Sequence, residues 1–237
     1  MTGHPLWRRA LAEFLGTGLL VAVVVGSGIA AQRLSTDTGL QLLENSIATA
    51  LGLGVLILLL APVSGAHFNP VISLADTLLH RRTGLPTPNL VVYLPAQILG
   101  GIAGAVLANA MFATPTTIST TDRATPATFL AEIVATAGLV LLIMGLTRTG
   151  RPTPVIAIAV GAYIGAAYWF TSSTSFANPA VTIGRIFTDT FAGIAPTSVL
   201  PFLAAQLIGA GVAIALTIVL FPRPRQSPNE QVVNEAI

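Results

Sequence analysis

Two asparagine–proline pairs at matching positions are the residues of this chain best suited to chemistry. They stand in the segments Asn69-Pro70-Val71 and Asn178-Pro179-Ala180, each beside a long apolar run. The asparagine oxygen can cap a helix while its amide donates hydrogen bonds, and proline suits the first helical turn. Within a membrane, broken backbone is tolerated only where protein buries it or where it lines a water-filled cavity. Two such breaks predict a pore that narrows near the membrane centre.

The composition places these pairs in an integral membrane protein. Only 8% of the 237 residues are charged, against about 25% in an ordinary soluble domain. Hydrophobic residues make up 53% of the chain, and the mean hydropathy is +0.80. No cysteine is present, and neither a nucleophile–base pair nor a metal-ligand cluster stands out, so we expect no enzyme, no cofactor and no metal site. The formal charge of +2 without a basic patch predicts no nucleic-acid partner.

The apolar runs predict six membrane spans, because a helix needs about 20 mostly apolar residues to cross a bilayer. The spans are expected at roughly 7–31, 44–63, 90–112, 127–147, 154–172 and 198–221. Arginines cluster on one side of these spans if both termini lie in the cytoplasm, which predicts that orientation in the cell membrane. Residues 222–237 form a polar tail, so residues 1–237 are expected to form a single channel domain with a short extension.

An internal repeat relates the two halves of the chain, about 7–112 and about 127–221. The segment Ala12–Thr17 matches Ala131–Thr136, and Pro95–Gly100 matches Ala204–Gly209. Each half holds three spans, an odd number, so the halves must cross the membrane in opposite orientations. This is an inverted-topology repeat, and it brings the two asparagine–proline segments in from opposite sides of the membrane.

These motifs together resemble the aquaporin and glycerol-facilitator channels. The resemblance rests on Glu13 within Ala12–Thr17, the loop Ser64–Pro70, the Ala96-Gln97 pair and the second asparagine–proline motif, and it covers about residues 8–221. It implies an all-α membrane fold with six transmembrane helices and two re-entrant half-helices. It also implies a homotetramer with one pore in each subunit. Two positions depart from the family pattern: Val71 replaces the usual alanine, and Val181 replaces the arginine that most members carry after the second motif.

The resemblance also assigns the narrowest part of the pore, the selectivity filter. Counting along the motifs places its four positions at Thr49, Ala166, Ser175 and Val181. Water-selective relatives hold a bulky aromatic residue, a histidine, a small residue and an arginine there, whereas these four are small and uncharged. We therefore expect a wide, mostly apolar filter that suits glycerol or metalloid hydroxides such as arsenous acid and methylated arsenicals. The chain resembles the bacterial branch that carries valine in place of the filter arginine and is associated with arsenic resistance.

The re-entrant segments supply the electrostatics that we expect of a pore for neutral solutes. Both half-helices aim their N-termini at the membrane centre, and each end carries about half a positive charge. Cations, including a hydrated proton, would meet a barrier there. A neutral solute would exchange water for the asparagine donors and for the backbone carbonyls of Gly65, Ala66, His67 and Ala177. His67 has two interpretations: a pH-sensitive group in the inner pore, or a packed side chain.

Three further charged residues have alternative interpretations. Glu13 and Glu132 lie within spans at matching places in the two halves, so each is expected to hold the re-entrant loop of its own half. The alternative is proton coupling, because a carboxylate within a membrane is by default a functional candidate. Arg185 follows Val181 by one helical turn and would lie in the outer vestibule, repelling cations. The alternatives are an arginine that reaches to the interface or a helix pair with Asp189.

The sequence therefore predicts a passive channel for water and small uncharged solutes, in contact with the lipid bilayer. The metalloid hydroxides are the sharper hypothesis, and a general water or glycerol channel is the alternative within this class. A different class remains open at this point, a proton-coupled secondary transporter or an anion channel, because inverted repeats with broken helices also build transporters.

Overall fold

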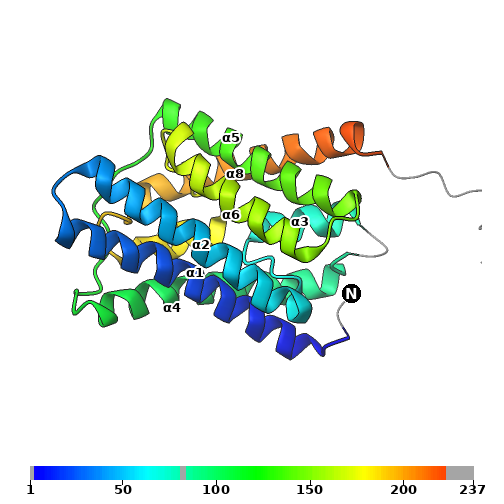
Figure 1. Cartoon of the computed structure of the whole chain (residues 1–237), viewed down its shortest axis with the longest axis horizontal. Helices are drawn as coiled ribbons and strands as arrows, with labels where there is room; N and C mark the ends of the chain where they lie inside the picture. The colour runs from blue at the N-terminus through cyan, green and yellow to red at the C-terminus, as the bar shows by residue number, and fades with distance from the viewer. Residues whose placement is uncertain (1–2, 81–83, 223–237) are drawn as a thin grey trace, which may run out of the picture.

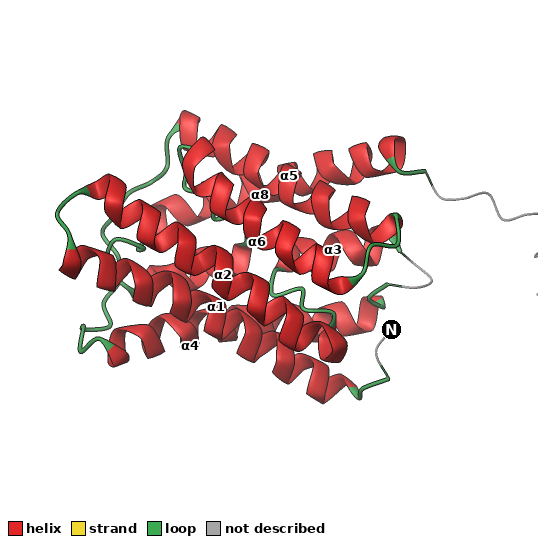
Figure 2. Cartoon of the chain, in the orientation of Figure 1, coloured by secondary structure: helices red, strands yellow, loops and turns green. Residues whose placement is uncertain are grey.

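The computed structural model describes residues 3–80 and 84–222, and its described part consists of helices and loops (Figure 2). Within these residues, six long helices are apolar enough to cross a membrane. They are α1 (Leu6–Leu34), α2 (Thr38–Ser64), α4 (Thr87–Met111), α5 (Pro126–Arg148), α6 (Thr153–Phe170) and α8 (Pro196–Leu220). The prediction of an all-α membrane protein is confirmed.

The two asparagine–proline segments open the short helices α3 (Pro70–Leu79) and α7 (Pro179–Gly184), and a 3₁₀ turn, η1 (Arg185–Phe187), extends α7. Asn69 caps α3 by accepting the backbone N–H of Val71 at 3.1 Å. Asn178 caps α7 by accepting the N–H groups of Ala180 and Val181 at 2.9 and 3.3 Å. Proline at the first helical position lacks only an N–H that would have no partner within the helix.

The two short helices enter the bundle from opposite ends. The cyan helix α3 lies toward the end where α1 begins, and the yellow segment that contains α7 lies toward the other end (Figure 1). Helix α1 begins and α8 ends at the same end of the bundle (Figure 1). That arrangement is the one expected if both termini share one side of the membrane.

One pair of long helices packs in the same way in each half of the chain: α1 packs against α4, and α5 packs against α8. Helix α1 also packs against α2, and α2 joins the two halves by packing against α6. The outward faces are apolar, with Leu51, Leu200 and Val219 at least two-thirds exposed. In water such a surface would be costly, but it suits a chain surrounded by lipid.

The predicted span limits differ from the observed helices by a few residues. Helix α2 begins at Thr38 rather than near 44, because the Asp37 carboxylate accepts the backbone N–H of Leu40 at 2.8 Å and caps the helix. Helix α6 ends at Phe170 rather than near 172. The arginines at 81, 82, 223 and 225, which contributed to the predicted orientation, lie outside the described residues, as does the predicted polar tail from residue 223 onward.

Candidate functional site: the pore

The two re-entrant loops share an unusual backbone conformation. Ala66 and Phe68 have φ angles of 52° and 49°, and the residues at matching places in the second half, Ser175 and Ala177, have φ angles of 53° and 47°. The left-handed conformation costs a residue with a side chain roughly 1–2 kcal/mol. Such a conformation persists only where the surroundings hold it in place.

Glu13 of α1 holds the first loop. Its fully buried carboxylate accepts the backbone N–H groups of His67 and Phe68 at 3.0 and 2.6 Å. The same carboxylate accepts the Ser64 hydroxyl at 2.6 Å and the Gln97 amide at 2.7 Å. All four partners donate to it, which matches the acceptor-only character of an ionised carboxyl group.

Glu132 of α5 makes the matching set of contacts in the second half. It accepts the N–H groups of Phe176 and Ala177 at 2.8 and 2.9 Å, and the Ser173 hydroxyl and Gln206 amide at 2.7 Å. The sequence motifs did not predict Gln97 and Gln206 as partners of the carboxylates. The signal was present, because a polar residue inside a span needs a partner, and these two are as far apart in sequence as the two asparagines.

The asparagine side chains join the two halves at the centre of the molecule. Asn69 Nδ2 donates to the carbonyl of Ala177, and Asn178 Nδ2 donates to the carbonyl of Phe68, both at 2.8 Å. Each amide group has two N–H donors, so one remains after this contact. Both asparagines line the central cavity, and the second donor is available to an oxygen within it.

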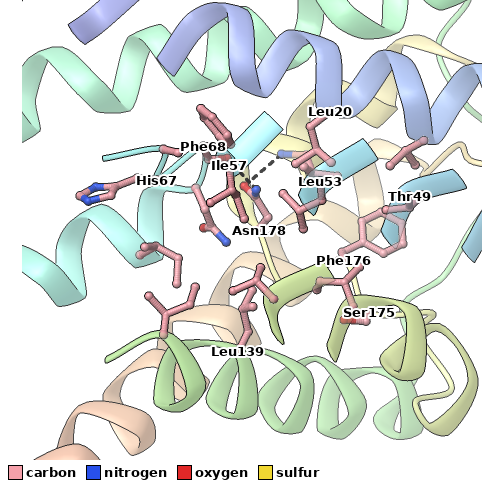
Figure 3. Close-up of a pocket in the computed structure, with 18 of the residues that line it drawn as sticks. Leu20, Thr49, Leu53, Ile57, His67, Phe68, Leu139, Ser175, Phe176 and Asn178 are labelled. Atoms are coloured by element: carbon pink, nitrogen blue, oxygen red, sulfur yellow. Dashed lines mark hydrogen bonds between the residues drawn. The ribbon is translucent and has the colours of Figure 1, made fainter. Parts of the chain in front are cut away.

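The central cavity has a volume of about 60 Å³ and a mostly apolar wall. Figure 3 shows His67 at one end, Thr49 and Ser175 toward the other, and Asn178 between them. The wall includes these residues predicted for the pore: Thr49, Ala66, His67, Asn69, Ser175, Asn178, Val181 and Arg185. The structure thus brings together residues from both halves around one narrow space.

Ala166, predicted as a filter position, lies on a face of α6 that points away from the cavity. Its side chain is exposed, whereas Val160, Ile164 and Tyr168 of the same helix line the cavity. Two residues along a helix correspond to a rotation of about 200°, so Ala166 points away from the face that holds Ile164 and Tyr168. The Tyr168 hydroxyl lies 3.0 Å from that of Thr49. A polar aromatic side chain therefore lines the cavity where the count along the motif predicted a small one.

The remaining predicted residues belong to the two loops and half-helices but do not face the cavity with a free group. Gly65 is not part of the cavity wall; it ends α2 in the left-handed conformation (φ 94°), which favours glycine. The Ala177 carbonyl, predicted to face the solute, already accepts the Asn69 amide. The other motif residues are buried at the starts of α3 and α7 and do not line the cavity: Pro70, Val71, Pro179 and Ala180.

Arg185 lies where the central cavity meets a larger cavity of about 630 Å³, whose wall also includes this residue and which would be the outer vestibule in the predicted orientation. Its guanidinium lies 3.5 Å from the centre of the Phe176 ring, and its Nε donates to the Ala192 carbonyl. Asp189 instead accepts the N–H and the hydroxyl of Thr120 at 2.9 and 3.1 Å. The side chain of Arg185 is therefore neither extended to the lipid interface nor paired with Asp189.

His67 both lines the cavity and packs against neighbouring side chains. Its Nδ1 lies 3.0 Å from the Ser73 hydroxyl, and its Nε2 lies 3.8 Å from Asp76. The ring of Tyr93 contacts it edge to face, at 5.7 Å between the ring centres. Among the described residues, no three histidine and carboxylate side chains are grouped so that they could hold a metal ion.

Comparison with known proteins agrees with this architecture. The profile of the family "Major intrinsic protein" matches residues 1–175. The chain is 50% identical to the aquaglyceroporin AqpS of Rhizobium meliloti (strain 1021), over 91% of each chain. It is 32% identical to aquaporin Z of Brucella melitensis biotype 1, over 84% of this chain and 91% of the relative.

A solved structure shares the fold. The aquaglyceroporin from Plasmodium falciparum superimposes with a TM-score of 0.69, covering 90% of this chain and 96% of its own, at 22% sequence identity. With six apolar helices around a central cavity and a family profile that matches most of its length, this chain belongs to the major intrinsic protein family of passive multi-pass membrane channels.

Proposed function

We propose that this channel conducts water and small uncharged solutes with hydroxyl groups, such as glycerol. The observation that carries the proposal is the pair of asparagine amides, each with one donor left over in a narrow cavity. The remaining wall is mostly apolar, so a solute is guided by few hydrogen bonds and is not held tightly. Relatives named aquaglyceroporin and glycerol uptake facilitator support the same class of solute.

Within this class we propose metalloid hydroxides, such as arsenous acid and methylated arsenicals, as solutes. Thr49, Ser175 and Val181 leave three sides of the proposed filter small, while Tyr168 restricts the fourth. The Ser175 hydroxyl has no hydrogen-bond partner among the described residues, and Ser175 lines the cavity, so we infer that this hydroxyl turns toward a solute hydroxyl. Arsenous acid, like glycerol, is uncharged and carries three hydroxyl groups.

We further propose a homotetramer in the cell membrane with both termini in the cytoplasm. The orientation is supported by the distribution of arginines and by the common end at which α1 begins and α8 ends. The tetramer follows from the family resemblance. Proton coupling is disfavoured, because Glu13 and Glu132 are fully buried and do not line the cavity.

The test is stopped-flow light scattering on proteoliposomes that contain the purified protein. Uptake of water, glycerol and arsenous acid is compared with and without a proton gradient, against vesicles without protein. Rapid uptake of glycerol and arsenous acid that ignores the gradient is the expected result. Water flux with exclusion of both solutes would contradict the proposed solute class, and uptake that follows the gradient would contradict a passive channel.

Val181→Arg is expected to restrict the filter to water. Val181 is buried in the cavity wall, so a longer charged side chain there narrows the path beside Tyr168. Glycerol uptake should fall at least roughly tenfold, which corresponds to about 1.4 kcal/mol of added barrier, while water flux changes little. Val181→Thr, which keeps the shape of the side chain, is the control. Equal losses of water and glycerol flux in Val181→Arg would argue against this assignment of the filter.

A further inference from the structure

Two arginines face the outer vestibule from distant parts of the chain. Arg123 belongs to the loop before α5 and Arg185 to the turn after α7, and both line the cavity of about 630 Å³. Arg185 also lines the central cavity, so its charge lies at the junction of the two spaces. The side chain of Arg185 is only 4% exposed, whereas that of Arg123 is half-buried.

One loop and one aromatic ring fix both guanidinium groups. Arg123 donates to the carbonyls of Gly193 and Phe191 at 2.6 and 2.7 Å, and Arg185 donates to the carbonyl of Ala192. The centre of the Phe176 ring lies 5.5 Å from Arg123 and 3.5 Å from Arg185. These neutral contacts hold the two positive charges in place without neutralising them.

The nearby carboxylates, which are Asp189, Asp122 and the buried Glu132, have other hydrogen-bond partners, and those of Glu132 are the second re-entrant loop and Gln206. Asp189 lines the vestibule, but its oxygens accept hydrogen bonds from Thr120 and Ser119. Asp122 accepts the Ser198 hydroxyl and the Ala124 N–H, and these hydrogen bonds lower its pKa, so it is ionised at neutral pH. Neither arginine forms an ion pair in the part of the chain that the structure describes.

Both arginines retain donors for a ligand. A guanidinium group has five N–H donors. Among the described residues, Arg185 uses only its Nε, and Arg123 uses its Nε and Nη2. Positive charge out of bulk water without a counter-ion is unfavourable, and guanidinium groups bind oxyanions through paired hydrogen bonds.

We propose that the outer vestibule binds a small dissolved oxyanion between Arg123 and Arg185, and that the bound ion slows the passage of neutral solutes. Arg185 joins the vestibule to the central cavity, so an ion bound to it occupies the approach to the filter. The described wall of the cavity beyond it is mostly apolar, so we expect the ion to stay at the mouth. The binding site itself is independent of which neutral solute the channel conducts.

Isothermal titration calorimetry of the purified protein with inorganic phosphate, against chloride at equal ionic strength, tests the site. Saturable phosphate binding is expected, weakened at least roughly tenfold in Arg123→Gln and in Arg185→Gln, the loss expected for a charged hydrogen bond. Arg33→Gln is the matched control, since Arg33 contacts the Phe112 carbonyl and lines neither cavity. Equal affinity in all four proteins, or binding of a short-chain phospholipid but not of phosphate, would overturn the proposal.

A second experiment needs only the native protein and so does not depend on how the variants fold. Phenylglyoxal modifies accessible guanidinium groups, and mass spectrometry of the peptides locates the adducts. Phosphate should protect Arg123 and Arg185 but not Arg33; equal modification with and without phosphate would contradict the site.

External phosphate should also slow glycerol uptake into proteoliposomes with a saturable dependence. Absence of any glycerol uptake would instead refute the proposed solute, while the calorimetric result would still decide the anion site.

Discussion

Replacing Glu13 or Glu132 with alanine is expected to prevent the channel from folding. Each carboxylate is fully buried and accepts four hydrogen bonds, two of them from the backbone of its re-entrant loop. A buried donor left without a partner costs about 1–3 kcal/mol. Four such losses are comparable with the whole stability of a typical protein, about 5–15 kcal/mol. The yield of a monodisperse peak on size exclusion in detergent measures the effect.

Glutamine at the same positions separates a structural role from proton coupling. The glutamine amide nitrogen is a donor, and it would face N–H and O–H groups that now donate to the carboxylate. Glu13→Gln and Glu132→Gln should therefore lower the thermal unfolding midpoint. The protein that folds should still conduct glycerol independently of a proton gradient. Glu44→Gln is the control, because Glu44 lies near the start of α2, whereas the first re-entrant loop follows the end of that helix. A stable variant that loses gradient-driven uptake would establish a coupled transporter instead.

Much of this architecture could be predicted because the chain repeats itself. The matching positions of Asn69 and Asn178 predicted two half-helices, and the structure caps both with those side chains. The matching positions of Glu13 and Glu132 predicted one carboxylate for each loop, and the hydrogen bonds follow that pattern. In each case a polar group in an apolar span requires a partner, and the repeat identifies where to look for it.

The filter was harder to predict because it depends on the rotation of a helix about its axis. Counting along the motifs selects Ala166, but α6 packs against α2 through Gly161 and Gly165 and presents Tyr168 to the cavity. Arg123 gave no local signal. Its place in the vestibule depends on carbonyls in the loop 191–193, about 70 residues later in the chain. Contacts of this kind are set by tertiary packing rather than by a motif.

Alanine at Gly100 or Gly209 is expected to separate the helix pairs that support the two halves. These glycines occupy matching positions in α4 and α8. A Cβ atom at Gly100 would lie 2.3 Å from the carbonyl oxygen of Phe14, and one at Gly209 would lie 2.5 Å from that of Ile133. Both obstacles are backbone atoms of a neighbouring helix, so no side chain can rotate away to relieve the clash. Each substitution should cost at least about 3 kcal/mol, the upper end of the usual range for overpacking.

Gly211 provides a control within the same helix as Gly209. A Cβ atom at Gly211 meets no other atom within 4 Å, so Gly211→Ala should leave stability unchanged or raise it by up to about 1 kcal/mol, the difference in helix propensity. Thermal unfolding of the three variants in detergent measures the contrast. Similar midpoints for Gly209→Ala and Gly211→Ala would mean that α5 and α8 do not approach as closely as the structure places them.

A selective loss at Gly100 and Gly209 would instead show that close backbone contact holds α1 to α4 and α5 to α8. Those helices carry Glu13 and Gln97 in one half and Glu132 and Gln206 in the other, so the same contact positions the groups that hold each re-entrant loop.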